Sequence, residues 1–276
     1  MSGTLYVVGT PIGNLGDISP RALQVLENCD FIAAEDTRVT LKLLNHFEIK
    51  KPMVSYFEHN RFERGPIIVE RILSGESCAI VTDAGMPAIS DPGEDLVKLC
   101  IEKGIRIEAV PGPCAFATAL AVSGMPSRRF TFEGFLPADK SSRREHIESL
   151  IGERRTMIFY EAPHKLSQTL SDLAKALGDR EIAIVRELTK IHEQVIKTTL
   201  CAASEKYAAE NLKGEIVLII GGAAPEKRKT ISVEQAALYA KELVKNGESK
   251  TEAAKIAAKE SGLKKGDIYK LLIQEN

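Results

Sequence analysis

The stretch A-I-V-T-D-A-G-M-P-A-I-S-D-P-G, residues 79–93, decides the fold. Its first four small or apolar residues predict a short buried strand, and the chain then breaks into a loop rich in Asp, Gly and Pro. A helical pattern of apolar residues follows from Gly93. Ligands of open α/β sheets bind at the carboxyl ends of the strands, so we expect a binding site at this turn. Gly85 would admit a ligand close to the backbone, and Asp83 would offer a carboxylate.

Two similar turns follow other predicted strands. V-G-T-P-I-G-N (residues 8–14) follows a strand at 4–8, and V-P-G-P-C-A (residues 110–115) follows a strand at 105–110. The first of these turns has neither the Gly-Lys-Ser/Thr ending of a P-loop nor the G-x-G-x-x-G of a dinucleotide fold. We therefore expect the three turns to form one small-molecule site that does not hydrolyse nucleoside triphosphates.

The order of elements predicts an α/β protein of two domains around a cleft, with a small helical extension. Strands alternate with helices through residues 1–122, which indicates a parallel sheet covered on both faces. After a linker at 123–127, the longer alternating strands of residues 127–223 favour a mixed sheet. Residues 225–231 are charged and predicted to be mobile. Residues 232–276 read as helices, and the last two, separated by Gly262, resemble a helix-turn-helix.

Composition narrows the class of protein. With 276 residues, 44% of them apolar, the chain can bury sizeable cores, and 37 basic against 38 acidic residues give no bulk attraction to a polyanion. Five scattered cysteines without metal-ligand spacing argue against a metal site or a disulfide framework. No apolar stretch approaches the ~20 residues of a membrane span, and no leader precedes the first strand, so we expect a soluble cytoplasmic protein.

Polar clusters end several predicted strands. They are E-D-T-R (35–38), F-E-H-N (57–60), E-A-P-H-K (161–165) and R-E-L-T-K (186–190). Each is open to two interpretations, a surface cap of the sheet or a polar edge that faces the site. The basic residues around 137–146 are likewise either solvated or in contact with phosphate groups.

Together these motifs resemble the tetrapyrrole methylase fold of S-adenosylmethionine-dependent methyltransferases. G-T-P-I-G-N-L-G-D-I (9–18), A-A-E-D-T-R (33–38), T-D-A-G-M-P-A-I-S-D-P-G (82–93), F-E-G-F-L-P (132–137) and R-E-L-T-K-I-H-E (186–193) are similar to one branch, the ribosomal RNA small subunit methyltransferase I group. The resemblance covers residues 3–222. It implies 2′-O-methylation of a decoding-region cytidine in 16S rRNA and, for so large a target, a homodimer.

The resemblance also implies roles for individual residues. The expected contacts to S-adenosylmethionine are Pro11, Asp83, Ala84, Gly85, Ile89, Cys114, Ala115, Tyr160 and Glu161. The expected contacts to RNA are Lys140, Arg143, Arg144, Lys165 and Arg186. Candidates for a general base are Glu35, Asp36, His59 and Glu161, and no metal is expected. Two alternatives stay open: a corrinoid or porphyrin-precursor methylase of the same fold, and a non-catalytic module that senses S-adenosylmethionine and binds nucleic acid.

Overall fold

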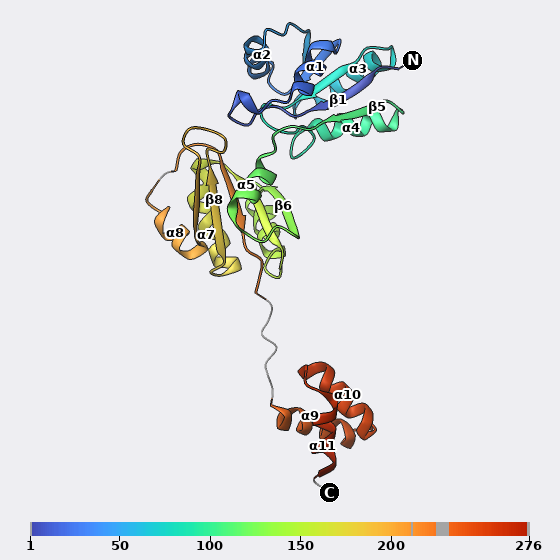
Figure 1. Cartoon of the computed structure of the whole chain (residues 1–276), viewed down its shortest axis with the longest axis vertical. Coiled ribbons are helices and arrows are strands. Elements are labelled where there is room, and N and C mark those ends of the chain that lie inside the picture. Colours follow the sequence, from blue (N-terminus) through green and yellow to red (C-terminus); the bar gives the residue numbers. More distant parts are fainter. Residues whose placement is uncertain (1, 211, 225–231, 275–276) are drawn as a thin grey trace. The chain divides into compact units, whose positions relative to one another are not determined.

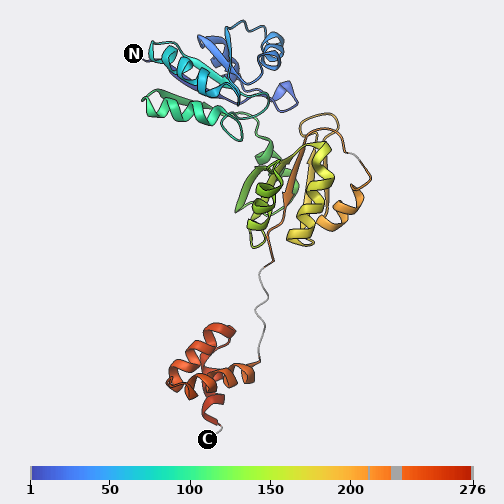
Figure 2. The ribbon, with the colours of Figure 1, turned by 180° about the vertical axis from the view of Figure 1, so that it is seen from behind.

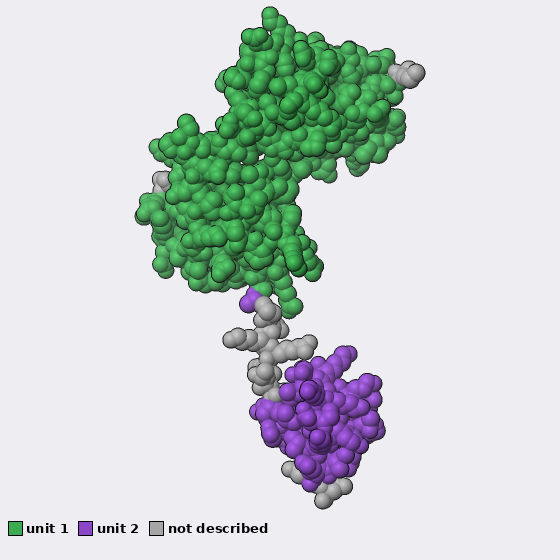
Figure 3. Space-filling view, viewed as in Figure 1, with its two compact units in different colours: residues 1–223 green, residues 224–276 purple. Residues whose placement is uncertain are grey.

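Residues 2–210, 212–224 and 232–274 are described by a computed structural model of the chain (Figure 1). The chain divides into two units, residues 1–223 and 224–276, which Figure 3 shows in separate colours. Residues 225–231, predicted to be mobile, lie outside the described residues.

The first unit begins with a parallel five-stranded sheet. Its strand order is β3-β2-β4-β1-β5, with β1 (Thr4–Val8), β2 (Phe31–Ala34), β3 (Met53–Ser55), β4 (Cys78–Val81) and β5 (Arg106–Val110). Successive side chains of a strand point to opposite faces. Leu5 and Val7 therefore pack with α3 (Arg61–Leu73) and α4 (Gly93–Glu102), while Val8 packs with α1 (Pro20–Asn28) and α2 (Thr37–His46). Both faces are covered, as predicted.

Helix α3 starts earlier than the sequence pattern suggests. Gly65 and Pro66 are weak helix formers that favour a start at Ile67, but the helix begins at Arg61. Gly65 lies where the helix packs tightly on its neighbour, since a Cβ there would be 3.0 Å from Cδ1 of Leu99 in α4. Packing against α4 thus outweighs the weak helix propensity of this residue.

The second sheet is mixed, as predicted. Its order is β6-β7-β10-β8-β9, with β6 (Phe130–Phe135), β7 (Thr156–Glu161), β8 (Glu181–Arg186), β9 (Gln194–Thr199) and β10 (Ile216–Ile220), and only β6 and β7 pair in parallel among these. Strand β9 stops at Thr199, whose hydroxyl caps the short helix α8 (Leu200–Lys206).

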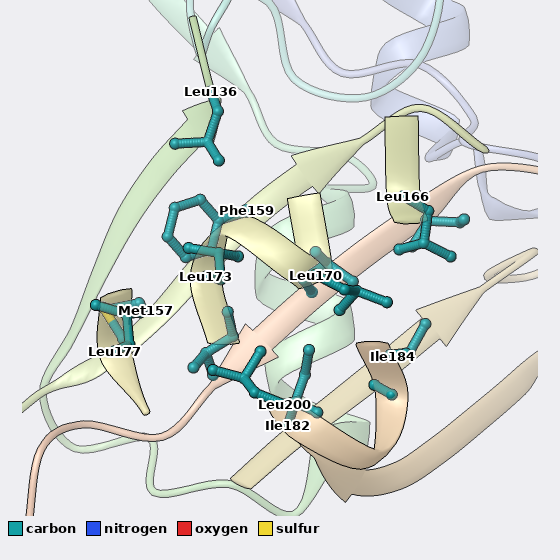
Figure 4. Packing of buried hydrophobic residues seen from close by; sticks show 14 of the residues in the cluster. Leu136, Met157, Phe159, Leu166, Leu170, Leu173, Leu177, Ile182, Ile184 and Leu200 are labelled. Carbon is teal, nitrogen blue, oxygen red and sulfur yellow. The ribbon is translucent and has the colours of Figure 1, made fainter. Parts of the chain in front are cut away.

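Helices cover the second sheet on both faces. On one face, α6 (Lys140–Ser149), α7 (Leu166–Leu177) and α8 close a core that includes Phe159, Leu170 and Leu173 (Figure 4). On the other face lies α5 (Ala115–Ser123), which precedes the predicted linker yet packs on this sheet through Ala119 and Leu120. Figure 1 and Figure 2, seen from opposite sides, both show α5 with the second sheet.

The second unit consists of α9 (Val233–Lys245), α10 (Lys250–Ser261) and α11 (Lys265–Gln274). Six buried alanines, three on α9 and three on α10, allow these helices to pack closely, and Ile268 and Leu272 of α11 complete the core. Gly262 ends α10 in the left-handed conformation with φ 74°, as its position between the last two helices predicts. Within the described ranges, no helix has both the length and the apolarity that crossing a membrane requires.

Candidate active site

The three glycine-containing bends meet, as their sequences predict. Thr10 of the first bend and Gly85 of the second exchange two backbone hydrogen bonds, with N···O distances of 2.9 and 3.1 Å. Gly9 donates its N–H to the carbonyl of Val110 at 3.1 Å, and a Cβ on Gly9 would lie only 2.7 Å from Cα of Gly112 in the third bend. Backbone contact this close requires glycine on both sides.

A cavity of about 450 Å³ opens beside these bends. One part of its wall comes from the first sheet and its bends: Ile12, Glu35, Thr82, Asp83, Ala84, Gly85, Met86, Ile89, Ser90, Asp91, Cys114 and Ala115. The other part comes from the second sheet and the segments next to its strands: Phe135, Tyr160, Glu161, Ala162, Pro163, Val185, Leu188, Glu215, Ile216 and Val217.

The cavity brings together most residues that were expected to contact the cofactor. Eight of the nine line it: Asp83, Ala84, Gly85, Ile89, Cys114, Ala115, Tyr160 and Glu161. Pro11 does not, but the next residue, Ile12, does. Sequence reasoning missed the wall formed by Val185, Leu188 and Glu215, although Leu188 belongs to the R-E-L-T-K motif that marks the end of β8.

The loop after β4 has an unusual backbone. Gly85, Ala88 and Ser90 adopt φ values of 93°, 66° and 67°, and two of these three residues carry a Cβ that disfavours the left-handed region. The carboxylate of Asp91 holds the loop by accepting hydrogen bonds from N–H of Ala88 (3.0 Å), Ile89 (3.3 Å) and Gly93 (2.7 Å). Such strain persists where surrounding contacts fix it, and it concentrates at functional sites.

The lining of the cavity favours a cationic ligand. Five of the lining residues are carboxylates, namely Glu35, Asp83, Asp91, Glu161 and Glu215, and none of the described residues in the lining is Lys, Arg or His. Burial raises the pKa of Asp83, and the nearby charge of Glu35 raises it further. A ligand with positive charge would relieve this repulsion, whereas a phosphate group would add to it.

The general-base candidates differ in placement. Glu35 lines the cavity; its Oε2 accepts from the hydroxyl of Thr82 and from N–H of Asp83, while its Oε1 accepts from no described residue. Glu161 also lines the cavity, but both of its oxygens are engaged, by N–H of Ala162 (2.8 Å) and by the hydroxyl of Thr169.

The other two candidates are held elsewhere. His59 is exposed, its ring centroid lies 6.1 Å from that of Phe57, and it is not among the lining residues. Asp36 forms an ion pair with Arg38 at 2.6 Å and is likewise outside the lining. Among the described residues, no group of three or more His, Cys, Asp or Glu is arranged to hold a metal ion.

A second cavity, of about 800 Å³, collects the basic residues that were expected to contact RNA. Lys140, Arg143, Arg144 and Lys165 line it together with Lys175, against the acidic Glu148 and Asp172. We call it the basic groove. Arg186 lies apart from it, with Nη1 donating to Oε1 of Gln194 at 3.3 Å.

Known proteins with similar sequences and structures bear on this site. The profile of the family described as Tetrapyrrole (Corrin/Porphyrin) Methylases matches residues 4–203. A relative named ribosomal RNA small subunit methyltransferase I, from Synechocystis sp., is 44% identical, and the match covers 99% of this chain and 98% of that one. A relative of the same name from Xylella fastidiosa is 47% identical over 97% of this chain and 98% of its own.

Solved structures share the fold at low identity. Uroporphyrin-III C-methyltransferase from Thermus thermophilus superposes with a TM-score of 0.58 at 19% identity, over 79% of this chain and 94% of that one. A structure of the Thermus enzyme complexed with S-adenosylhomocysteine gives a TM-score of 0.57 at 17% identity, over 79% of this chain and 97% of that one. At this identity the likeness concerns the fold alone.

Proposed function

This chain belongs to the tetrapyrrole methylase family and, within it, to the ribosomal RNA small subunit methyltransferase I proteins, and we propose that it methylates the ribose 2′-oxygen of a decoding-region cytidine in 16S rRNA with S-adenosylmethionine as donor. One observation supports this most strongly: among the described residues, the wall of the cavity beside the three bends has five carboxylates and no basic side chain. A sulfonium donor is a cation without phosphates, so it matches this wall.

The residues of the cavity fit the donor group by group. Asp83 would face its ammonium group, and the bend at Gly85 would accept its adenine and ribose against the backbone. The start of α5, next to Cys114 and Ala115, would face its carboxylate, because helix N-termini attract anions. Bound S-adenosylmethionine supplies a methyl group that its positively charged sulfur already activates.

Alignment is therefore the main task of the chain. Positioning of reactants can contribute about 7–11 kcal/mol to lowering a barrier. Two sets of hydrogen bonds hold the wall of the cavity in place, which suits this task. One set joins Thr10 and Gly85, and the other joins the carboxylate of Asp91 to backbone N–H groups of its own loop. We assign proton acceptance from the ribose hydroxyl to Glu35, because its Oε1 has no partner among the described residues, whereas both oxygens of Glu161 are engaged.

The basic groove would bind the phosphodiester backbone of the RNA. Five cations against two carboxylates line it, and guanidinium and ammonium groups bind phosphates without regard to sequence. The helix-turn-helix-like α10 and α11 would add a second contact. From a target on the small ribosomal subunit we infer a reaction in the cytoplasm. A homodimer would extend the surface available to this target, and light scattering after size-exclusion chromatography tests the dimer.

The test is a parallel incubation of the full chain with methyl-labelled S-adenosylmethionine and three acceptors: 30S subunits, naked 16S rRNA and a tetrapyrrole precursor. We expect label in rRNA that survives in alkali-resistant dinucleotides, the signature of a 2′-O-methyl group. Label only in the tetrapyrrole would overturn the RNA assignment, and binding of the donor without any turnover would indicate a sensing module instead.

A further inference from the structure

A chain of side chains connects the basic groove to the donor cavity. Arg143 of α6 lines the groove, and its Nη2 donates to the hydroxyl oxygen of Thr169 on α7 at 2.7 Å. Thr169 in turn donates its hydroxyl proton to Oε2 of Glu161, at the end of β7. Glu161 lines the donor cavity, so three consecutive groups join the two sites.

The direction of these hydrogen bonds is fixed by chemistry. A guanidinium can only donate and an ionised carboxylate can only accept, so the single proton of the Thr169 hydroxyl must point to Glu161. Both Thr169 and Glu161 are buried, with 0% and 5% of their surface exposed. Burial weakens the screening of the hydrogen bond between them, so part of the charge of Arg143 compensates that of Glu161 through one polarised hydroxyl.

Arg143 also retains capacity for a ligand. A guanidinium has five N–H donors. Nε of Arg143 donates to Asp172 at 3.0 Å and one N–H of Nη2 donates to Thr169, so three donors are left for a ligand. Asp172 binds Arg143 through one oxygen only, since its other oxygen accepts from Nε2 of Gln168 at 2.6 Å. The Arg143 side chain is 14% exposed, so a phosphate in the groove can reach it.

We propose that Arg143 and Thr169 are positioning residues that couple RNA binding in the basic groove to donor binding in the cavity. A phosphate on Arg143 neutralises part of the guanidinium charge. The carboxylate of Glu161 is then less compensated and attracts a cationic donor more strongly. Coupling of this kind is reciprocal: RNA tightens donor binding by the factor by which the donor tightens RNA binding. The identity of the polyanion as RNA rests on the function proposed above.

Calorimetry on the full chain tests the coupling without turnover. The ligand is sinefungin, a non-transferable analogue of the donor that keeps a positive charge at the place of the sulfonium, and the probe is a decoding-region fragment of 16S rRNA. For the unmodified chain we expect the RNA to lower the Kd of sinefungin at least roughly fivefold. Neutral S-adenosylhomocysteine should show a smaller effect, because it lacks that charge.

Two substitutions at Thr169 isolate the hydroxyl. Thr169→Val keeps the shape but removes the link, and we expect the coupling to fall below about twofold; Thr169→Ser keeps the hydroxyl and should retain it. Arg144→Ala is the control: Arg144 lines the same groove but pairs with Glu148, so this variant should weaken RNA binding and leave the coupling factor unchanged.

The outcomes separate this inference from the proposed function. The link would be overturned if the Thr169→Val and Thr169→Ser variants showed equal coupling. It would also be overturned if the unmodified chain methylated rRNA but showed no coupling. If rRNA is not methylated but a polyanion such as heparin still tightens sinefungin binding only when the Thr169 hydroxyl is present, the link holds and the substrate assignment falls.

Discussion

Substitution of Gly112 by alanine tests whether the meeting of the bends builds the site. A Cβ at this position would lie 2.8 Å from C, Cα and O of Gly9, whereas ordinary van der Waals contact begins near 3.4 Å. The two bends would have to separate by about 0.6 Å, and backbone on both sides leaves no flexible side chain to give way. Overpacking of this kind costs typically about 1–3 kcal/mol.

In a unit of this size, each kcal/mol lowers Tm by roughly 2–4 °C, so Gly112→Ala should lower the first unfolding transition in calorimetry by about 2–12 °C. The same displacement moves the start of α5 at the cavity, so the Kd for S-adenosylmethionine should rise as well. Gly152→Ala is the matched control, because a Cβ there meets no atom within 4 Å. A Gly112→Ala chain with the Tm and Kd of this control would refute the contact between the bends.

Three further predictions concern single side chains. Glu35→Gln should lower kcat about 10²–10⁴-fold with little change in donor Kd, if Glu35 accepts the proton; an unchanged kcat in single-turnover assays would remove it from that role. Asp83→Asn should weaken donor binding roughly tenfold at neutral pH, measured by calorimetry. The pKa of Asp83 is raised in the folded chain, mainly by burial, so its protonation stabilises the fold as pH falls through that raised pKa. Over the same pH range, donor affinity should drop until it matches that of the Asp83→Asn variant. An equal loss of donor affinity in the Asp83→Asn variant over this range would contradict the prediction. Gly266→Ala, on the exposed start of α11, should stabilise the second unit by about 0.5–1 kcal/mol, seen as slower amide exchange in residues 265–274.

Local chemistry made much of this fold predictable. Strands β1, β2 and β8 run as the sequence indicates, because each is a short apolar run bounded by polar or turn-forming residues. The bends were predictable for the same reason, since Gly85 adopts a positive φ and Asp83 closely follows a buried strand. The family assignment followed from these motifs and is confirmed by the relatives.

The features that could not be predicted depend on strand order and side-chain direction. His59 follows β3, which lies at the edge of the first sheet, two strands from β4, whose loop forms the cavity wall. Arg186 ends β8 next to Val185, and only Val185 lines the cavity, because neighbouring side chains of a strand point to opposite faces. Neither the pairing of distant strands nor the orientation of a strand's last residue can be read from a local pattern.

The placement of α5 determines how this unit can be dissected. The helix follows the third bend directly, yet its side chains Ala119 and Leu120 belong to the core on one face of the second sheet, with Ile158, Ala183 and Ile219. A fragment beginning at the apparent linker, residue 127, would present that apolar surface to water and should aggregate. A fragment beginning at Cys114 keeps this surface covered by α5. The second half should therefore be expressed from Cys114, thirteen residues before residue 127, where the glycine- and proline-containing linker ends.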